Sequence, residues 1–260
     1  MCGVFWLCYS FFMKHFLEPK LEINSLKSEH LNEGVSPIMA CVGSPRQFAE
    51  NPGTEEEFWN SARNNNPDIR NVDYYGDSRE LKSQNFKNAG EYSYVISPVD
   101  ETDKFSAGFK DCTGVIVTGV DKKTGQNVSF LSHEDPTHFL DGKKNKSDFI
   151  ASLQERLLEI KEKSEGGTID AVVVGGNYYR DDEEYLERYK KSIELLSREI
   201  SKIFGFEPVI MTGPKSEYGK DDVFFDNKNR RLYIRRPVVG DSTTESFVHS
   251  DIKNQGEKWL

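Results

Sequence analysis

The apolar positions of this chain are unevenly distributed. Residues 17–95 are polar and rich in Asn, Ser, Glu and Pro, whereas the apolar residues concentrate within about 105–236. We therefore predict a polar, partly ordered N-terminal extension over 1–90, a folded domain over 91–239 and a flexible polar tail over 240–260.

Two segments of the predicted domain have the periodicity of amphipathic helices. Over 147–164, with Ser147 as the expected N-cap, apolar residues recur at steps of three and four, and Gly166–Gly167 follows. The same spacing recurs over 181–204, and Gly205 follows. Because glycine readily adopts the left-handed conformation that ends a helix, we expect both helices to stop at these glycines.

Short apolar or alternating segments predict strands around these helices. The segments 112–120 and 128–133 flank the loop DKKTGQ and predict a β-hairpin, in which Gly125 can take a left-handed turn position. Further strands are predicted at 92–99, 168–176 and 207–213, and a second hairpin over 221–238 with its turn at Asp226–Asn229. This order of elements predicts an α+β domain, in which two helices pack on a layered, sandwich-like mixed β-sheet.

Charge and composition narrow the possible partners. The 260-residue chain has a net charge of −9, a pI near 5.2 and a mean hydropathy of −0.65. It has no basic stripe, so we expect no nucleic-acid partner. Its four cysteines, Cys2, Cys8, Cys41 and Cys112, are scattered along the chain, which is typical of reduced thiols in the cytosol.

The first residues, MCGVFWLCYSFFMKHF, contain an apolar run of about 12 residues, which is shorter than a membrane-spanning helix requires. The segment also lacks the basic region and the small-residue cleavage site of a secretory signal. We therefore expect no stable membrane span. The interpretations left open are a lipid-anchored or interfacial segment through Cys2 or Cys8, a packed N-terminal strand, and a start-codon artefact with Met13 as the true start.

Cys112 and His133 are the candidates for chemistry, because they begin and end the first predicted hairpin. A turn centred between Lys122 and Lys123 would place them directly opposite each other, with their Cβ atoms about 5 Å apart. A turn centred between Lys123 and Thr124 would place them diagonally on the same face, roughly 7 Å apart. A bulge at Gly125 would shift the parity of the pairing, so the sequence does not fix the register.

A thiol beside an imidazole can act as a nucleophile activated by a base. The thiolate attacks an amide or ester carbon, a thioester forms, and water completes the hydrolysis. A third group should orient the imidazole or bind the oxyanion, and the candidates are the backbone N–H of Cys112, the Ser106 hydroxyl, Asp111 and Asp135. The alternatives are a structural thiol and imidazole, or a metal site that adds Asp135 and His138. The spacing does not support zinc, so we predict no metal and no cofactor.

Two other motifs invite functional interpretations that we do not favour. Gly175–Gly176 lacks the remaining glycines and the lysine of nucleotide-binding loops, so it predicts tight packing at a strand end. The local basic cluster predicts a solvated edge strand, and it consists of Arg230, Arg231, Arg235 and Arg236.

Four motifs follow one another along the chain: FSAGFKDCTGVIV around Cys112, LSH ending at His133 with Pro136 after it, VVVGG at 172–176, and VFFDNKNRRLYIRRP at 223–237. This ordered set, which covers about 92–237, resembles the chemoreceptor glutamine deamidase CheD. That family shares its fold and its Cys–His dyad with the catalytic domain of cytotoxic necrotizing factor. Ser106 lies six residues before the cysteine, where the family carries its active-site threonine.

The resemblance implies that Cys112 is the nucleophile, that His133 is the base and acid, and that the Ser106 hydroxyl positions the imidazole. The implied reaction is hydrolysis of a protein glutamine side-chain amide to glutamate and ammonia, without a cofactor. The implied partner is a protein substrate that carries an accessible glutamine. The chain departs from the family at Lys110 and Asp111, where the family has Gly and Ser, and also over 212–221.

The long N-terminal extension has no counterpart in the compact chemotaxis enzyme, which favours a toxin-like or effector-like deamidase. The expected location is the cytoplasm, or a host or target cell after export. Two alternatives remain open. A transglutaminase or a cysteine peptidase would use the same dyad, and a non-catalytic protein-binding module would keep the fold without the chemistry.

Overall fold

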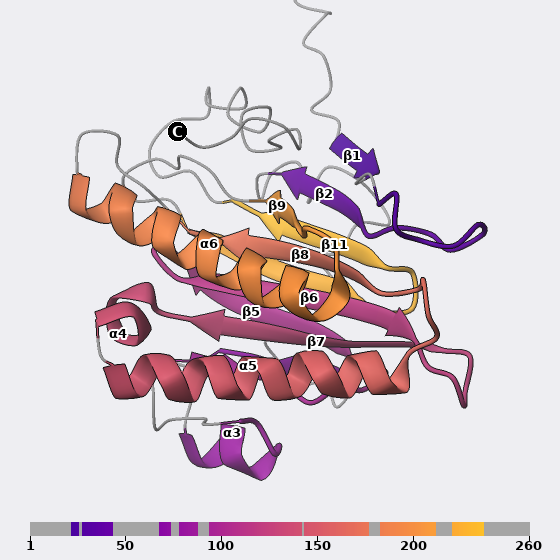
Figure 1. The fold of residues 1–260 in the computed structure, drawn as a ribbon, viewed down its shortest axis with the longest axis horizontal. Helices are drawn as coiled ribbons and strands as arrows, with labels where there is room; N and C mark the ends of the chain where they lie inside the picture. Colours follow the sequence, from indigo (N-terminus) through magenta and orange to yellow (C-terminus); the bar gives the residue numbers. More distant parts are fainter. Residues whose placement is uncertain are drawn as a thin grey trace, which may run out of the picture.

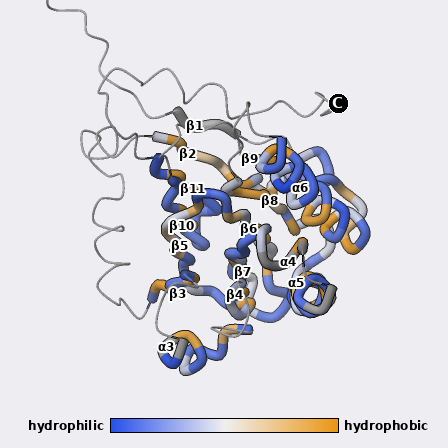
Figure 2. The backbone as a smooth tube through the Cα atoms, turned by 90° about the vertical axis from the view of Figure 1, so that its left-hand side faces the viewer, coloured by the Kyte–Doolittle hydropathy of each residue, from blue (hydrophilic) through white to orange (hydrophobic). Residues whose placement is uncertain are grey.

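The computed structural model describes residues 22–25, 28–43, 68–73, 78–87, 94–141, 143–176, 183–211 and 220–236. The predicted tail over 240–260 and the apolar N-terminal run lie outside these residues. Within them the chain has a layered α+β fold, as the sequence predicts. Two β-sheets face each other, and two long helices cover the outer face of one sheet (Figures 1 and 2).

Each sheet combines parallel and antiparallel strand pairs. The strands of the larger sheet are β1 (Glu22–Ser25), β2 (Met39–Gly43), β3 (Ile69–Asn71), β5 (Asp103–Phe109), β10 (Asp221–Asp226) and β11 (Arg231–Arg235). The strands of the smaller sheet are β4 (Tyr94–Ile96), β6 (Thr113–Val120), β7 (Asn127–Glu134), β8 (Asp170–Gly175) and β9 (Val209–Met211). The larger sheet has the order β1-β2-β11-β10-β5-β3, and the smaller has the order β4-β7-β6-β8-β9. The described helices are α3 (Ser78–Ser83), α4 (Pro136–Asp141), α5 (Lys143–Lys163) and α6 (Glu183–Phe204).

The alternation of residues along the smaller sheet builds two separate apolar cores. On β6, Ile116 faces the larger sheet, together with Val172 of β8. Val115 and Val117 face the opposite way, toward the buried stripes of α5 and α6. Because both faces of this sheet are covered, its strands are almost continuously buried. Figure 2 shows the three resulting layers in one view.

Both predicted helices are confirmed, with one difference at a boundary. Helix α5 begins at Lys143, ahead of the predicted cap Ser147, and α6 begins at Glu183. The glycines after them adopt positive φ, 71° at Gly167 and 83° at Gly205. These are the left-handed positions that end helices. No helix among the described residues has both the length and the apolar character needed to cross a membrane.

The N-terminal part of the chain contributes more to the fold than the predicted extension over 1–90 implies. Strand β2 is an interior strand, since it pairs with β1 on one side and runs parallel to β11 on the other. Strand β3 pairs in parallel with β5. The larger sheet is therefore built partly from residues that precede the predicted start of the domain at residue 91. The sequence analysis also missed β5 itself.

The interpretation of the arginine cluster as a solvated edge strand is wrong. Strand β11 lies between β2 and β10, and three of the four arginines in and beside it are held by specific partners, whereas Arg231 is exposed. Arg236 makes two hydrogen bonds of 2.8 Å to the Asp221 carboxylate. Arg235 bonds Asp222 at 2.6 Å. Arg230, which takes φ 53° in the turn over 227–230, is buried and donates to backbone carbonyls.

The buried carboxylate of Asp170 ties the N-terminal segment to the smaller sheet. Asp170 is 1% exposed and accepts the Ser28 hydroxyl at 3.0 Å and the Ile38 backbone N–H at 2.8 Å. One acidic group at the start of β8 therefore fixes both ends of the segment 28–38. This segment leads directly into β2.

We predict that Asp170→Ala lowers the free energy of unfolding by about 2–4 kcal/mol, because the substitution leaves buried donors without an acceptor. Hydrogen exchange should speed up across 28–38. Urea denaturation and exchange mass spectrometry measure the two effects, with the exposed Glu162→Ala as the control. Equal stabilities of the Asp170 and Glu162 variants would contradict the anchoring role.

Candidate active site

The β6–β7 hairpin adopts the second of the two predicted registers. Thr113 pairs with Glu134, and Ile116 pairs with Leu131, so the turn is centred between Lys123 and Thr124. Gly125 has φ 68°, as expected for the turn. Cys112, which directly precedes β6, is therefore diagonal to His133. It belongs to the core between the two sheets, on the face that His133 shares with its β4 partner Val95.

A hydrogen bond between the two sheets fixes the His133 ring. The Ser106 Oγ on β5 lies 2.7 Å from His133 Nδ1 on β7, and both residues are fully buried. The same hydroxyl donates to the Val72 carbonyl at 2.6 Å. Because the hydroxyl proton is directed at Val72, Nδ1 must carry the proton that Ser106 Oγ accepts. This tautomer leaves Nε2 as the basic nitrogen.

Val72 brings a residue of the N-terminal segment into the site. It follows β3, and its own N–H donates to the Phe105 carbonyl at 2.7 Å. The pairing of β3 with β5 thus places the Val72 carbonyl within hydrogen-bond distance of the Ser106 hydroxyl. Sequence reasoning missed this partner, because a backbone carbonyl carries no residue-specific signal.

Burial determines the protonation state of the base. Complete removal from water lowers the pKa of His133 to about 3, and the Val72 carbonyl opposes this shift only in part. The imidazole is therefore neutral near pH 7. A neutral imidazole with a fixed Nδ1 proton is the form that can accept a proton at Nε2.

The turn that carries Cys112 is anchored on both sides. The Gly176 N–H donates to the Cys112 carbonyl at 2.6 Å. On the β5 side, Gly108 adopts φ 83° and donates its N–H to Asp222 Oδ1 at 3.1 Å. Asp222 is itself held by Arg235. The Cys112 side chain is nearly buried in this arrangement, with 3% of its surface exposed.

The remaining candidates have other roles or lie outside the description. Asp135 accepts the Thr137 N–H at 2.9 Å and so caps the start of α4. The side chain of His138 is not among those described. Within the described part of the chain, no group of three or more His, Cys, Asp or Glu side chains is arranged to hold a metal ion. Gly175–Gly176 packs tightly at a strand end, since a Cβ on Gly175 would lie 2.4 Å from the Cys112 carbonyl oxygen.

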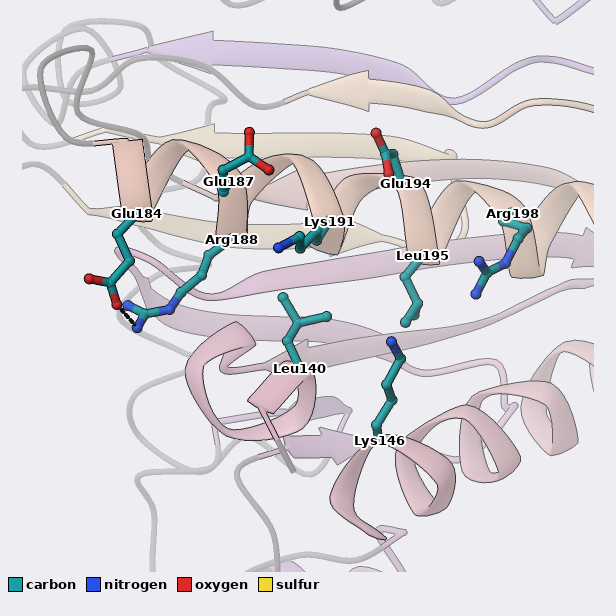
Figure 3. Close-up of a pocket in the computed structure, with 9 residues that line it drawn as sticks. All are labelled: Leu140, Lys146, Glu184, Glu187, Arg188, Lys191, Glu194, Leu195 and Arg198. Carbon is teal, nitrogen blue, oxygen red and sulfur yellow. Dashed lines mark hydrogen bonds and ion pairs between the residues drawn. The ribbon is translucent and has the colours of Figure 1, made fainter. Parts of the chain in front are cut away.

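A groove of about 540 Å³ lies apart from these residues, between α4, α5 and α6 (Figure 3). Leu140 and Leu195 form part of its wall, and charged side chains form most of the rest. Arg188 is paired with Glu184 (Figure 3), and Glu187 lies 3.6 Å from Lys190. All of these residues belong to the helical layer. The groove is therefore separated from Ser106 and His133 by the smaller sheet.

Comparison with known proteins adds no assignment to this geometry: no protein-family model matches the chain, and no curated protein is significantly similar to it in sequence.

Glu134, which the sequence analysis did not single out, is a buried carboxyl group beside the site. It follows His133 on β7 and points toward the helices, where Thr113 hydrogen-bonds Ser192 of α6 at 2.7 Å. Among the described residues, neither of its carboxyl oxygens has a hydrogen-bond partner of normal geometry. Burial raises its pKa well above 4.5, and the hydroxyls of Ser132 and Thr113 offset this only in part. Glu134 is therefore protonated over a wider pH range than an exposed glutamate.

We predict that Glu134→Gln becomes more stable relative to the native protein as the pH rises above 4.5. The folded-state pKa is raised, so Glu134 favours the folded state below pH 4.5, and this contribution is lost as the pH rises toward the folded-state pKa. The difference in free energy of unfolding should grow by at most about 1.4 kcal/mol per pH unit. Urea denaturation at a series of pH values measures it, and a difference independent of pH would contradict the assignment.

Proposed function

We propose that this protein is a cysteine-dependent amidohydrolase that converts a glutamine side chain of a protein substrate to glutamate. Cys112 is the nucleophile, His133 is the base and acid, and Ser106 positions the imidazole. The observation that carries the proposal is the hydrogen bond from His133 Nδ1 to Ser106 Oγ, with the serine proton directed at Val72. It sets the imidazole as a neutral base on the face of the sheet that also carries Cys112.

In the proposed reaction, His133 Nε2 takes the proton of the Cys112 thiol as the sulfur attacks the side-chain carbonyl carbon of glutamine. The imidazolium then gives this proton to the amide nitrogen, and the C–N bond breaks to release ammonia. A thioester between Cys112 and the substrate remains. His133 next activates a water molecule, which attacks the thioester and releases glutamate and the free thiol. The reaction consumes one water molecule and requires no cofactor.

The order of motifs that resembles CheD supports glutamine as the target, and the Ser106–His133 contact agrees with the role that the resemblance implies for Ser106. A transglutaminase or a peptidase would form its thioester with the same residues. Water as the acceptor distinguishes the proposed deamidase from a transglutaminase, and a side-chain amide as the target distinguishes it from a peptidase. The proposed enzyme would act in its own cytoplasm or in a target cell after export.

One observation favours a different class of function. Cys112 is 3% exposed and His133 is fully buried, so a substrate amide reaches the sulfur only if the residues around it move on binding. A protein-binding module that keeps the fold would need no such movement. Thiol reactivity separates the two proposals.

We predict that Cys112 reacts with iodoacetamide faster at neutral pH in the native protein than in His133→Ala, because the neutral imidazole can accept the thiol proton as the sulfur attacks. Ser106→Ala should slow labelling at neutral pH by roughly 10-fold, because the imidazole loses its fixed tautomer, whereas Ser106→Thr should keep the reactivity. Site-resolved mass spectrometry against pH measures these rates. Ordinary thiol reactivity that is insensitive to His133→Ala would leave the binding module as the better proposal.

We also predict that the protein deamidates glutamine in a proteome extract, and that Cys112→Ser does not. Mass spectrometry detects the mass change that accompanies replacement of the amide nitrogen by oxygen. Adding a primary amine tests the acceptor, because a transglutaminase would attach the amine to the same glutamines. Peptide-bond cleavage without deamidation would instead identify a peptidase.

A further inference from the structure

The ring of Phe109 lies directly against the His133 imidazole. The ring centroids are 4.0 Å apart, and the planes differ by 15°, so the two rings are stacked. Both side chains are fully buried. Phe109 ends β5, in the larger sheet, whereas His133 is on β7 in the smaller sheet. The stack is therefore a second contact across the sandwich, in addition to the hydrogen bond from Ser106.

Two glycines make room for this phenylalanine. A Cβ on Gly114 would lie 2.9 Å from Phe109 Cε1, and a Cβ on Gly175 would lie 2.6 Å from Phe109 Cδ1. The register of β6 and β7 puts Gly114 opposite His133. A cross-strand side chain would normally fill the position beside the imidazole. Here Phe109 fills it from the other sheet.

The imidazole is thereby held from several sides. Val95 of β4 is its direct cross-strand partner and is fully buried. Phe109 lies against its face, and Ser106 bonds its Nδ1. A flat ring in this position opposes rotation of the imidazole out of the plane in which Nδ1 meets Ser106. It also excludes water from one face of the base, which contributes to the burial of His133.

Phe109 also connects the base to the nucleophile. It ends β5 directly before the short connection over 110–112 that carries Cys112, and it follows Gly108, which Asp222 holds. A displacement of this connection would move the thiol and would release the imidazole at the same time. The stack thus couples the positions of the two groups that the proposed reaction requires.

We infer that Phe109 is a positioning residue, whose ring fixes the orientation of His133 so that Nδ1 stays on Ser106 and Nε2 stays available to Cys112. The effect of Phe109 on catalysis rests on the proposed function. The control of the His133 ring orientation by Phe109 does not, and it can be tested in the protein without substrate.

The decisive variant is Phe109→Met, which keeps an apolar side chain of similar length but removes the flat ring. The matched control is Phe225→Met, because Phe225 is equally buried in the same core between the sheets. Nitrogen-15 NMR of the histidine ring reports its tautomer and its pKa. Iodoacetamide labelling reports the reactivity of Cys112.

We predict that Phe109→Met lets His133 populate both tautomers and raises its pKa from about 3 toward 6.5, because water gains access to the ring. Labelling of Cys112 at neutral pH should fall by about 10-fold or more. Phe225→Met should lose comparable stability without either change. A tautomer and a pKa that are the same in Phe109→Met as in the native protein would overturn the inference.

The native protein provides a measurement that does not depend on a variant folding. A stacked phenylalanine shifts the carbon-bound protons of the His133 ring upfield, and normal shifts for these protons would overturn the inference. The two proposals also fail separately. If Phe109→Met alters His133 while native Cys112 reacts as an ordinary thiol, the proposed function fails and the positioning stands. If native Cys112 is activated and stays equally reactive in Phe109→Met, the positioning role of Phe109 fails and the proposed function stands.

Discussion

The hydrogen bond between Ser106 and His133 is the contact on which the candidate site depends. It joins a hydroxyl on the larger sheet to an imidazole on the smaller one, inside a core from which water is excluded. A buried polar atom without a partner is costly, so this contact restricts how the two sheets can be placed relative to each other. Val72 extends it by one further bond, and so connects the N-terminal segment to the same constraint. One short chain of polar atoms therefore fixes the tautomer of the candidate base and connects the two sheets to the N-terminal segment.

The hairpin carries two buried ionisable groups in succession, and burial shifts them in opposite senses. Removal from water lowers the pKa of His133 and raises the pKa of Glu134, so burial favours the neutral form of both groups. The unfolded chain would hold them charged between pH 4.5 and pH 6.5. Within this window their effects on the pH dependence of stability oppose each other, because folding removes a proton from His133 and adds one to Glu134. Burial thereby disfavours charge on both faces of the strand that carries the candidate base.

The glycines around the site show how the absence of side chains can shape chemistry. Gly114 and Gly175 leave a space in the smaller sheet, and Phe109 enters it from the larger one. Gly176 approaches closely enough to donate its N–H to the Cys112 carbonyl. The glycine pair that invites a nucleotide-binding interpretation in the sequence is thus part of the packing around the candidate nucleophile. Small residues at these positions let an aromatic ring of one sheet stack on an imidazole of the other, in the core that also holds Cys112.

The sequence by itself determined the periodic elements and the candidate pair. Repeating apolar steps predicted α5 and α6, the glycines marked their ends, and the β6–β7 hairpin followed from two apolar segments around a glycine-containing loop. These signals depend on residues close together in the chain, so they can be recognised without knowledge of the fold. Only the tertiary structure decided the hairpin register, the placement of β2, β3 and β5 in the larger sheet, and the interior position of β11 between β2 and β10. It also brought Val72 and Phe109 to His133. These features depend on contacts between residues far apart in the chain. A backbone carbonyl or a core phenylalanine has no sequence signal that predicts such a contact.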